Sequence, residues 1–133
     1  MTRRQLTVTR IAFAVYLIVV AWLCFGHFDG MPDVERSILG IPTDKIVHFL
    51  MFAPFPVLAY YAFDRFSKKR WASVLWSVVA FIAGALLAAG SEIGQAFLTT
   101  YRSGDPADLL ADTLGLAAGT LIVLVLIFRK NPR

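Results

Sequence analysis

Charged residues are scarce in this chain, and four long stretches carry almost none. Asp, Glu, Lys and Arg make up 17% of the 133 residues, apolar residues make up 58%, and the mean hydropathy is +0.67. An ordinary water-soluble domain needs a larger polar shell and is therefore excluded. Because backbone groups in lipid must bond within their own segment, we expect an all-α, polytopic membrane protein with a single domain over residues 1–133. Its four transmembrane helices are expected at about 11–28, 46–63, 71–98 and 109–128.

Cysteine is nearly absent, and several site signatures are missing altogether. Cys24 is the only cysteine, so the chain cannot form an internal disulfide. The sequence contains neither an HExxH motif nor a cysteine cluster, so it lacks these signatures of a dedicated metal site. The basic residues do not group as a nucleic-acid surface requires, so no nucleic-acid partner is expected. The basic and then apolar N-terminal segment is similar to a signal peptide, but its length and the three later spans predict a retained helix.

Lys and Arg are distributed unevenly around the four spans. Ten of the thirteen are Arg3, Arg4, Arg10, Arg65, Lys68, Lys69, Arg70, Arg129, Lys130 and Arg133. All ten lie before the first span, between the second and third spans, or after the fourth. The other connectors carry only Arg36, Lys45 and Arg102. Because basic flanks are retained in the cytoplasm, this distribution predicts that both termini are cytoplasmic.

The second span contains two prolines, Pro54 and Pro56. Proline has no backbone N–H, and its ring clashes with the carbonyl group one turn earlier. The two X-Pro steps therefore predict a kink in the middle of this helix.

Glycines four residues apart recur in the last two spans. Gly90 and Gly94 form one such pair, and Gly115 and Gly119 form the other. In membrane helices this spacing lets two backbones approach closely. We therefore expect close helix packing at both pairs.

Three spans each carry an ionisable residue at a similar depth. His48 lies four residues after Asp44, where the second span begins, so it is about 6 Å deep at ~1.5 Å per residue. Glu92 lies six residues before the end of the third span and is about 9 Å deep by the same rise. Asp112 is at a similar depth in the fourth span, one turn after Asp108. Since charged groups inside a bilayer usually mark function, we expect them to converge on a polar pocket open to the outer surface. The expected ligand-binding residues are Asp44, Lys45, His48, Glu92, Gln95, Arg102, Asp108 and Asp112.

Three motifs follow one another through the same region. They are D-K-x-x-H-F at residues 44–49, S-E-x-x-Q at 91–95, and Arg102 followed by D-x-x-x-[N/D]-x-x-G at 108–115. In this joint order the chain resembles the VanZ-like family of small bacterial membrane proteins over residues 44–119. The resemblance implies a four-helix, multi-pass protein of the bacterial cytoplasmic membrane and, for the founding member, low-level resistance to the glycopeptide teicoplanin. Where many members have Asn, this chain has Asp112, which adds a potential negative charge.

The predicted site has more acid than base. Its acids are Asp44, Glu92, Asp105, Asp108 and Asp112, and its bases are Lys45 and Arg102. Isolated buried carboxylates do not remain charged in a medium of low dielectric constant. We therefore expect either that Glu92 or Asp112 keeps its proton, or that a cation lies among them.

Two interpretations of the site involve no catalysis. In the first, the residues bind a cell-envelope lipid or a lipid-linked precursor without breaking a bond. In the second, they form a purely structural network in which Arg102 pairs with Glu92 and His48 bonds to Gln95. The sequence leaves both open, and it also leaves the oligomeric state open.

A third interpretation is a membrane-embedded lipid-modifying enzyme. His48 and Glu92 would be the catalytic base and acid, with Asp108 orienting His48. Alternatively, His48, Glu92 and Asp112 would hold a divalent metal, helped by His27 at the end of the first span. No activated nucleophile stands out in the sequence.

Overall fold

The computed structural model describes residues 2–25, 37–38, 41–63, 69–98 and 106–129. Its helices are α1 (Arg3–Phe25), α2 (Thr43–Phe52), α3 (Pro54–Phe63), α4 (Arg70–Leu98) and α5 (Pro106–Arg129). An antiparallel pairing of two residues each, β1 (Ser37–Ile38) with β2 (Ile41–Pro42), precedes α2. Apart from this pairing, the regular structure of these ranges is helical, which confirms the all-α fold class.

Within the described ranges, four segments are long and apolar enough to cross a membrane, as predicted. They are Arg3–Cys24, Lys45–Phe63, Arg70–Gly94 and Pro106–Arg129. α1 begins before the apolar run because Thr2 and Gln5 form a capping box. The Gln5 N–H donates to Thr2 Oγ1 over 3.1 Å, and the Thr2 N–H donates to Gln5 Oε1 over 2.7 Å. The assignment of residues 1–133 to a single domain stays a prediction.

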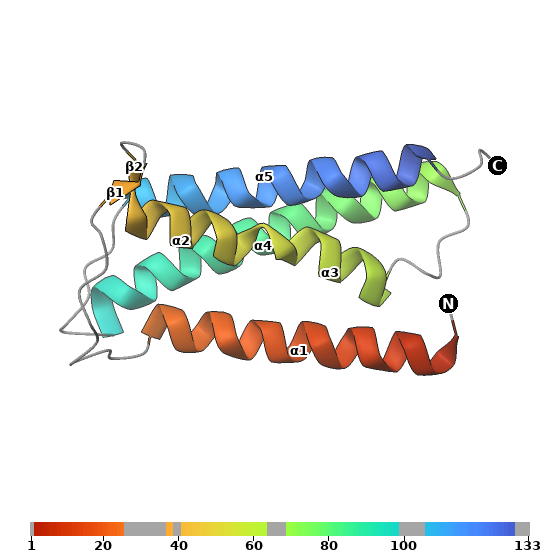
Figure 1. Ribbon diagram of the computed structural model, residues 1–133, viewed down its shortest axis with the longest axis horizontal. Coiled ribbons are helices and arrows are strands. Elements are labelled where there is room, and N and C mark those ends of the chain that lie inside the picture. Colours follow the sequence, from red (N-terminus) through yellow and green to blue (C-terminus); the bar gives the residue numbers. More distant parts are fainter. Residues whose placement is uncertain (1, 26–36, 39–40, 64–68, 99–105, 130–133) are drawn as a thin grey trace.

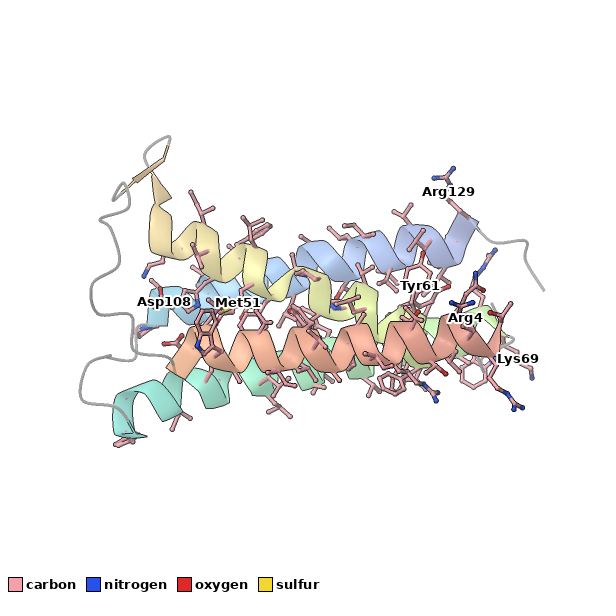
Figure 2. All side chains as sticks on the ribbon, turned by 60° about the horizontal axis from the view of Figure 1, so that its bottom comes forward. Arg4, Met51, Tyr61, Lys69, Asp108 and Arg129 are labelled. Carbon is pink, nitrogen blue, oxygen red and sulfur yellow. The ribbon has the colours of Figure 1, made fainter. Side chains whose placement is uncertain are left out.

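The spans alternate in direction along one bundle (Figure 1). α1 begins and α5 ends at the same end of the bundle, and α2 begins at the opposite end. Arg4, Lys69 and Arg129 lie at the first end, whereas Asp108 lies at the other (Figure 2). We call these the basic end and the acidic end. The position of either end relative to the cytoplasm stays a prediction.

The second span is divided at Ala53, directly before Pro54, into α2 and α3. The Ala53 N–H still donates to the backbone oxygen of Phe49 over 3.0 Å. Pro54 and Pro56 have no N–H to donate to the carbonyl groups four residues earlier, so the helical hydrogen-bond ladder is interrupted here. The division falls where the prolines predict it, and the kink itself stays a prediction.

Glycines on α5 bring its backbone against the second span. A Cβ added at Gly115 would overlap the backbone oxygen of Phe49, and one at Gly119 would overlap that of Ala53. This contact confirms the close packing predicted for the glycine pair on α5. At Gly90 on α4 the same prediction is wrong, because a Cβ there would meet no atom within 4 Å. Gly90 borders a hollow between α1 and α4 instead of a neighbouring backbone.

The apolar core lies one helical turn inward from the polar residues of the predicted site. Residues four apart share a helix face, so each polar face continues into the core. Three buried core residues each lie four positions from a polar residue on the same helix: Phe52 from His48, Ala88 from Glu92, and Leu116 from Asp112. The site is therefore closed by apolar packing on its inner side.

Candidate functional site

His48 on α2 and Asp112 on α5 form the centre of the site. His48 Nδ1 lies 2.7 Å from Asp112 Oδ1, and the Asp112 side chain is fully buried. Gly115 allows this approach, because its missing side chain leaves room for the backbone oxygen of Phe49, the residue after His48. When Asp112 is ionised it only accepts hydrogen bonds, so Nδ1 then donates to it, and Nε2 remains for a second partner.

Asp108, one turn earlier on α5, lies between Lys45 and His48. The Lys45 ammonium forms an ion pair with Asp108 Oδ1, and Asp108 Oδ2 lies 3.5 Å from His48 Nε2. Asp108 is in the first turn of α5, where the helix dipole favours a negative charge. Lys45 and His48 are three residues apart on α2, and Asp108 and Asp112 are four apart on α5. Each pair shares a helix face, so two polar faces meet.

Glu92 joins this group from α4. Its side chain is buried, with 7% of its surface exposed. His48, Glu92 and Asp108 each offer one nitrogen or oxygen atom within 4.8 Å of those of the other two. Ionisable side chains of three spans thus converge at the acidic end, as their depths predict. Helix capping does not explain Glu92, because it lies six residues before the end of α4.

We call Lys45, His48, Glu92, Asp108 and Asp112 the polar cluster. The structure does not describe the side chains of the remaining predicted residues. Arg102, Asp105 and His27 lie outside the described residues, and Asp44 and Gln95 are described by their backbone alone, in α2 and α4. The contacts that the structural interpretation assigns to Arg102 and Gln95 therefore stay predictions, as does a pocket that opens outward.

The polar cluster has more negative than positive charge. With three ionised carboxylates, one lysine and a neutral His48, it carries two excess negative charges. Asp112 Oδ2 is buried and has no hydrogen-bond partner among the described residues. A neutral His48 that donates from Nδ1 would also point its Nε2 lone pair at Asp108. A proton or another cation at Nε2 removes this repulsion, so the cluster suits a cationic partner.

Three residues of the cluster are placed to hold a divalent metal, namely His48, Glu92 and Asp108. Imidazole nitrogen with carboxylate oxygen is a donor set that Zn²⁺ accepts. Asp112 would then be the outer carboxylate that orients the imidazole, as metal-binding histidines commonly require. The sequence placed Asp112 among the ligands themselves. Spacing along α5 shows that the two aspartates share a face, but it does not show which of them meets which nitrogen of His48.

Tyr16 on α1 makes a polar contact that the sequence interpretation missed. Its hydroxyl donates to the backbone oxygen of Met51, just before the division of the second span. The bond ties the first span to the second at the level of the core. A tyrosine hydroxyl in an apolar setting needs a partner, but a backbone acceptor leaves no signal in the sequence.

The fold and the cluster together define a small multi-pass membrane protein whose ionisable side chains gather at one end of a four-span bundle. The family model described as VanZ/LLP1 matches residues 13–129, a range that includes the whole polar cluster. The chain therefore belongs to the VanZ/LLP1 family, and the resemblance noted from its motifs is confirmed. No curated protein and no solved structure matches the chain.

Proposed function

We propose that this VanZ/LLP1 protein binds the polar head group of a cell-envelope lipid or lipid-linked precursor at its acidic end. The observation that carries the proposal is the convergence of the polar cluster from three spans in one buried group. Ionisable side chains in a bilayer are expensive and usually mark ligand sites. Asp112 Oδ2, buried without a hydrogen-bond partner among the described residues, indicates that the cluster does not satisfy itself.

The proposal places the protein in the cytoplasmic membrane of a bacterium, with both termini in the cytoplasm. Arg4, Lys69 and Arg129 lie at the basic end (Figure 2). Basic flanks are retained on the cytoplasmic side. The acidic end then lies in the outer leaflet, where it meets the head groups of lipids displayed outside the cell.

A head group that carries charges of both signs suits the cluster best. The ammonium of Lys45 supplies a donor for a phosphate oxygen. The carboxylates accept hydrogen bonds from an ammonium or a hydroxyl group of the same head group. A purely anionic head group would meet a field of its own sign and would need a bridging cation.

Native mass spectrometry of the purified protein tests this proposal. The wild type is expected to carry a specific envelope lipid, and Lys45→Ala is expected to lose it because the phosphate loses its ammonium partner. Lys69→Ala is the matched control, since Lys69 lies at the basic end (Figure 2). A random lipid population on the wild type, or equal lipid retention by the two variants, contradicts the proposal.

A second candidate function is a membrane-embedded lipid-modifying enzyme. It is favoured by the contact of His48 Nδ1 with Asp112, which leaves Nε2 beside Asp108 for acid–base or metal-assisted chemistry, with Glu92 in the same group of side chains. Glu92→Gln should then abolish turnover of envelope lipid while the folded protein still binds it. Unchanged turnover removes Glu92 as a catalytic residue.

The family resemblance adds a phenotype to the proposal. By holding an envelope lipid or precursor, the protein would reduce susceptibility to the glycopeptide teicoplanin. The test is the inhibitory concentration of teicoplanin for a susceptible strain that expresses the wild type, Lys45→Ala or Lys69→Ala. A purely structural cluster makes a different prediction, because a Lys45 variant that remains folded would then act like the wild type.

A further inference from the structure

An apolar hollow of about 330 Å³ lies beside the polar cluster, between α1 and α4. Tyr16 and Cys24 mark its extent along α1, Phe52 lines it from α2, and Leu87 and Ser91 line it from α4. None of the five residues of the polar cluster is part of its wall. The hollow is therefore a separate feature that the head-group proposal does not use.

Gly90 opens this hollow. A Cβ at Gly90 would meet no atom within 4 Å. Gly90 and Leu87 are also both exposed on a helix that spans the membrane. The hollow is thus accessible from the side, where the surrounding molecules are lipids.

The dimensions of the hollow fit one hydrocarbon chain. Tyr16 and Cys24 are eight residues apart, which is about 12 Å along a helix at ~1.5 Å per residue. Half of a bilayer core of ~30 Å is about 15 Å deep. A volume of about 330 Å³ is roughly twice the ~150 Å³ of an apolar protein cavity that binds benzene. The hollow therefore matches one hydrocarbon chain in length and is large enough to receive it.

The hollow and the polar cluster share two helices, α2 and α4, and on each of them their residues are close neighbours. Phe52 follows His48 by four residues on α2, so the two share a face about 6 Å apart. On α4, Ser91 in the wall of the hollow directly precedes Glu92 in the cluster. A molecule with a polar head and an apolar chain would reach both at once.

We propose that the hollow receives one hydrocarbon chain of the lipid whose head group the polar cluster binds. This inference rests on the proposed function and adds a second, apolar subsite to it. A chain gains no hydrophobic free energy by moving from the bilayer into a protein hollow. The hollow therefore contributes packing contacts and positions the head group, and it favours lipids in which one chain can separate from the rest of the molecule.

The test fills the hollow without touching the cluster. Gly90→Leu places a side chain in the open space and replaces glycine by a better helix former, so the variant should fold. Ala83→Leu adds the same bulk at an exposed position of α4 outside the hollow and is the matched control. The probes are palmitoyl-oleoyl phosphatidylethanolamine, its single-chain lyso form, and glycerophosphoethanolamine, which has no chain. Each is added to delipidated protein, and bound lipid is measured by native mass spectrometry.

The wild type and Ala83→Leu are expected to retain the two-chain and one-chain probes equally and to release the probe without a chain. Gly90→Leu is expected to retain both lipids about tenfold less. Retention by Gly90→Leu at the wild-type level, with loss in Lys45→Ala, overturns the chain subsite and leaves the head-group proposal standing. Loss in Gly90→Leu with retention in Lys45→Ala shows that the hollow binds a chain without the polar cluster, which overturns the head-group proposal and the joint site that rests on it. A wild-type dimer that Gly90→Leu separates assigns the hollow to a second copy and overturns the inference, and a wild type that binds neither lipid overturns both proposals.

Discussion

His48 Nδ1 lies 2.7 Å from Asp112 Oδ1, and this contact joins α2 to α5 inside the bundle. It fixes the orientation of the imidazole, so that Nε2 is the nitrogen that faces Asp108. The same contact links two spans that are far apart in the sequence. It is thus both a packing contact and the element that prepares the polar cluster for a ligand.

Asp112→Ala should therefore lower the free energy of unfolding more than Asp112→Asn. Asparagine keeps the size of the side chain and an oxygen that accepts the bond from His48 Nδ1. Alanine leaves a buried donor without a partner, which costs about 1–3 kcal/mol. Thermal unfolding in detergent measures the difference. Equal stability of the two variants would show that the contact contributes nothing to the fold.

The ion pair between Lys45 and Asp108 should show energetic coupling. Their side chains are only 19% and 12% exposed, so water screens the pair less than it screens a surface ion pair. A double-mutant cycle with Lys45→Ala and Asp108→Ala is expected to give a coupling energy of about 0.5–3 kcal/mol. The control cycle combines Lys69→Ala with Asp108→Ala. It should give no coupling energy, because Lys69 lies at the opposite end of the bundle from Asp108 (Figure 2). A similar coupling energy in both cycles would contradict a specific pair.

The metal-assisted alternative makes its own prediction. If His48, Glu92 and Asp108 hold a divalent cation, Zn²⁺ should stabilise the folded protein by about 2.7 kcal/mol at a hundred times its dissociation constant. Asp108→Asn should abolish this stabilisation, and a chelator should reverse it in the wild type. Lys69→Ala is the control and should respond like the wild type. A wild-type unfolding temperature that Zn²⁺ leaves unchanged would remove this alternative and leave the head-group proposal intact.

The fold and the convergence of the cluster were predictable from the sequence for a physical reason. A bilayer forces apolar stretches into helices, and helical geometry then fixes the depth of each polar residue. His48, Glu92 and Asp112 lie at similar depths in three spans, so only one rotation of each helix brings them together. The hydrophobic faces that continue into Phe52 and Leu116 enforce that rotation.

The detail within the site was not predictable in the same way. Asp108 and Asp112 share one face of α5 and are one turn apart. Their spacing does not say which of them contacts Nε2 of His48 and which contacts Nδ1. The bond from Tyr16 to the backbone oxygen of Met51 depends on how α1 docks, which local sequence does not encode. The hollow at Gly90 depends on the distance between α1 and α4, which no sequence motif indicates. Each of these features is set by packing between spans.

Gly90 and Gly115 each begin a pair of glycines four residues apart, but the same substitution to alanine should change the stability of the protein differently at the two positions. Gly115→Ala forces a methyl group against the backbone oxygen of Phe49 and should destabilise the protein by about 1–3 kcal/mol, since the backbone must move to accommodate it. It should also weaken lipid binding, because the displaced backbone is the one that carries His48. Gly90→Ala meets open space and should leave stability unchanged or raise it by about 0.4–1 kcal/mol. Thermal unfolding of the two variants in detergent measures this contrast, and equal effects at the two positions would show that α5 does not contact α2 as the structure describes.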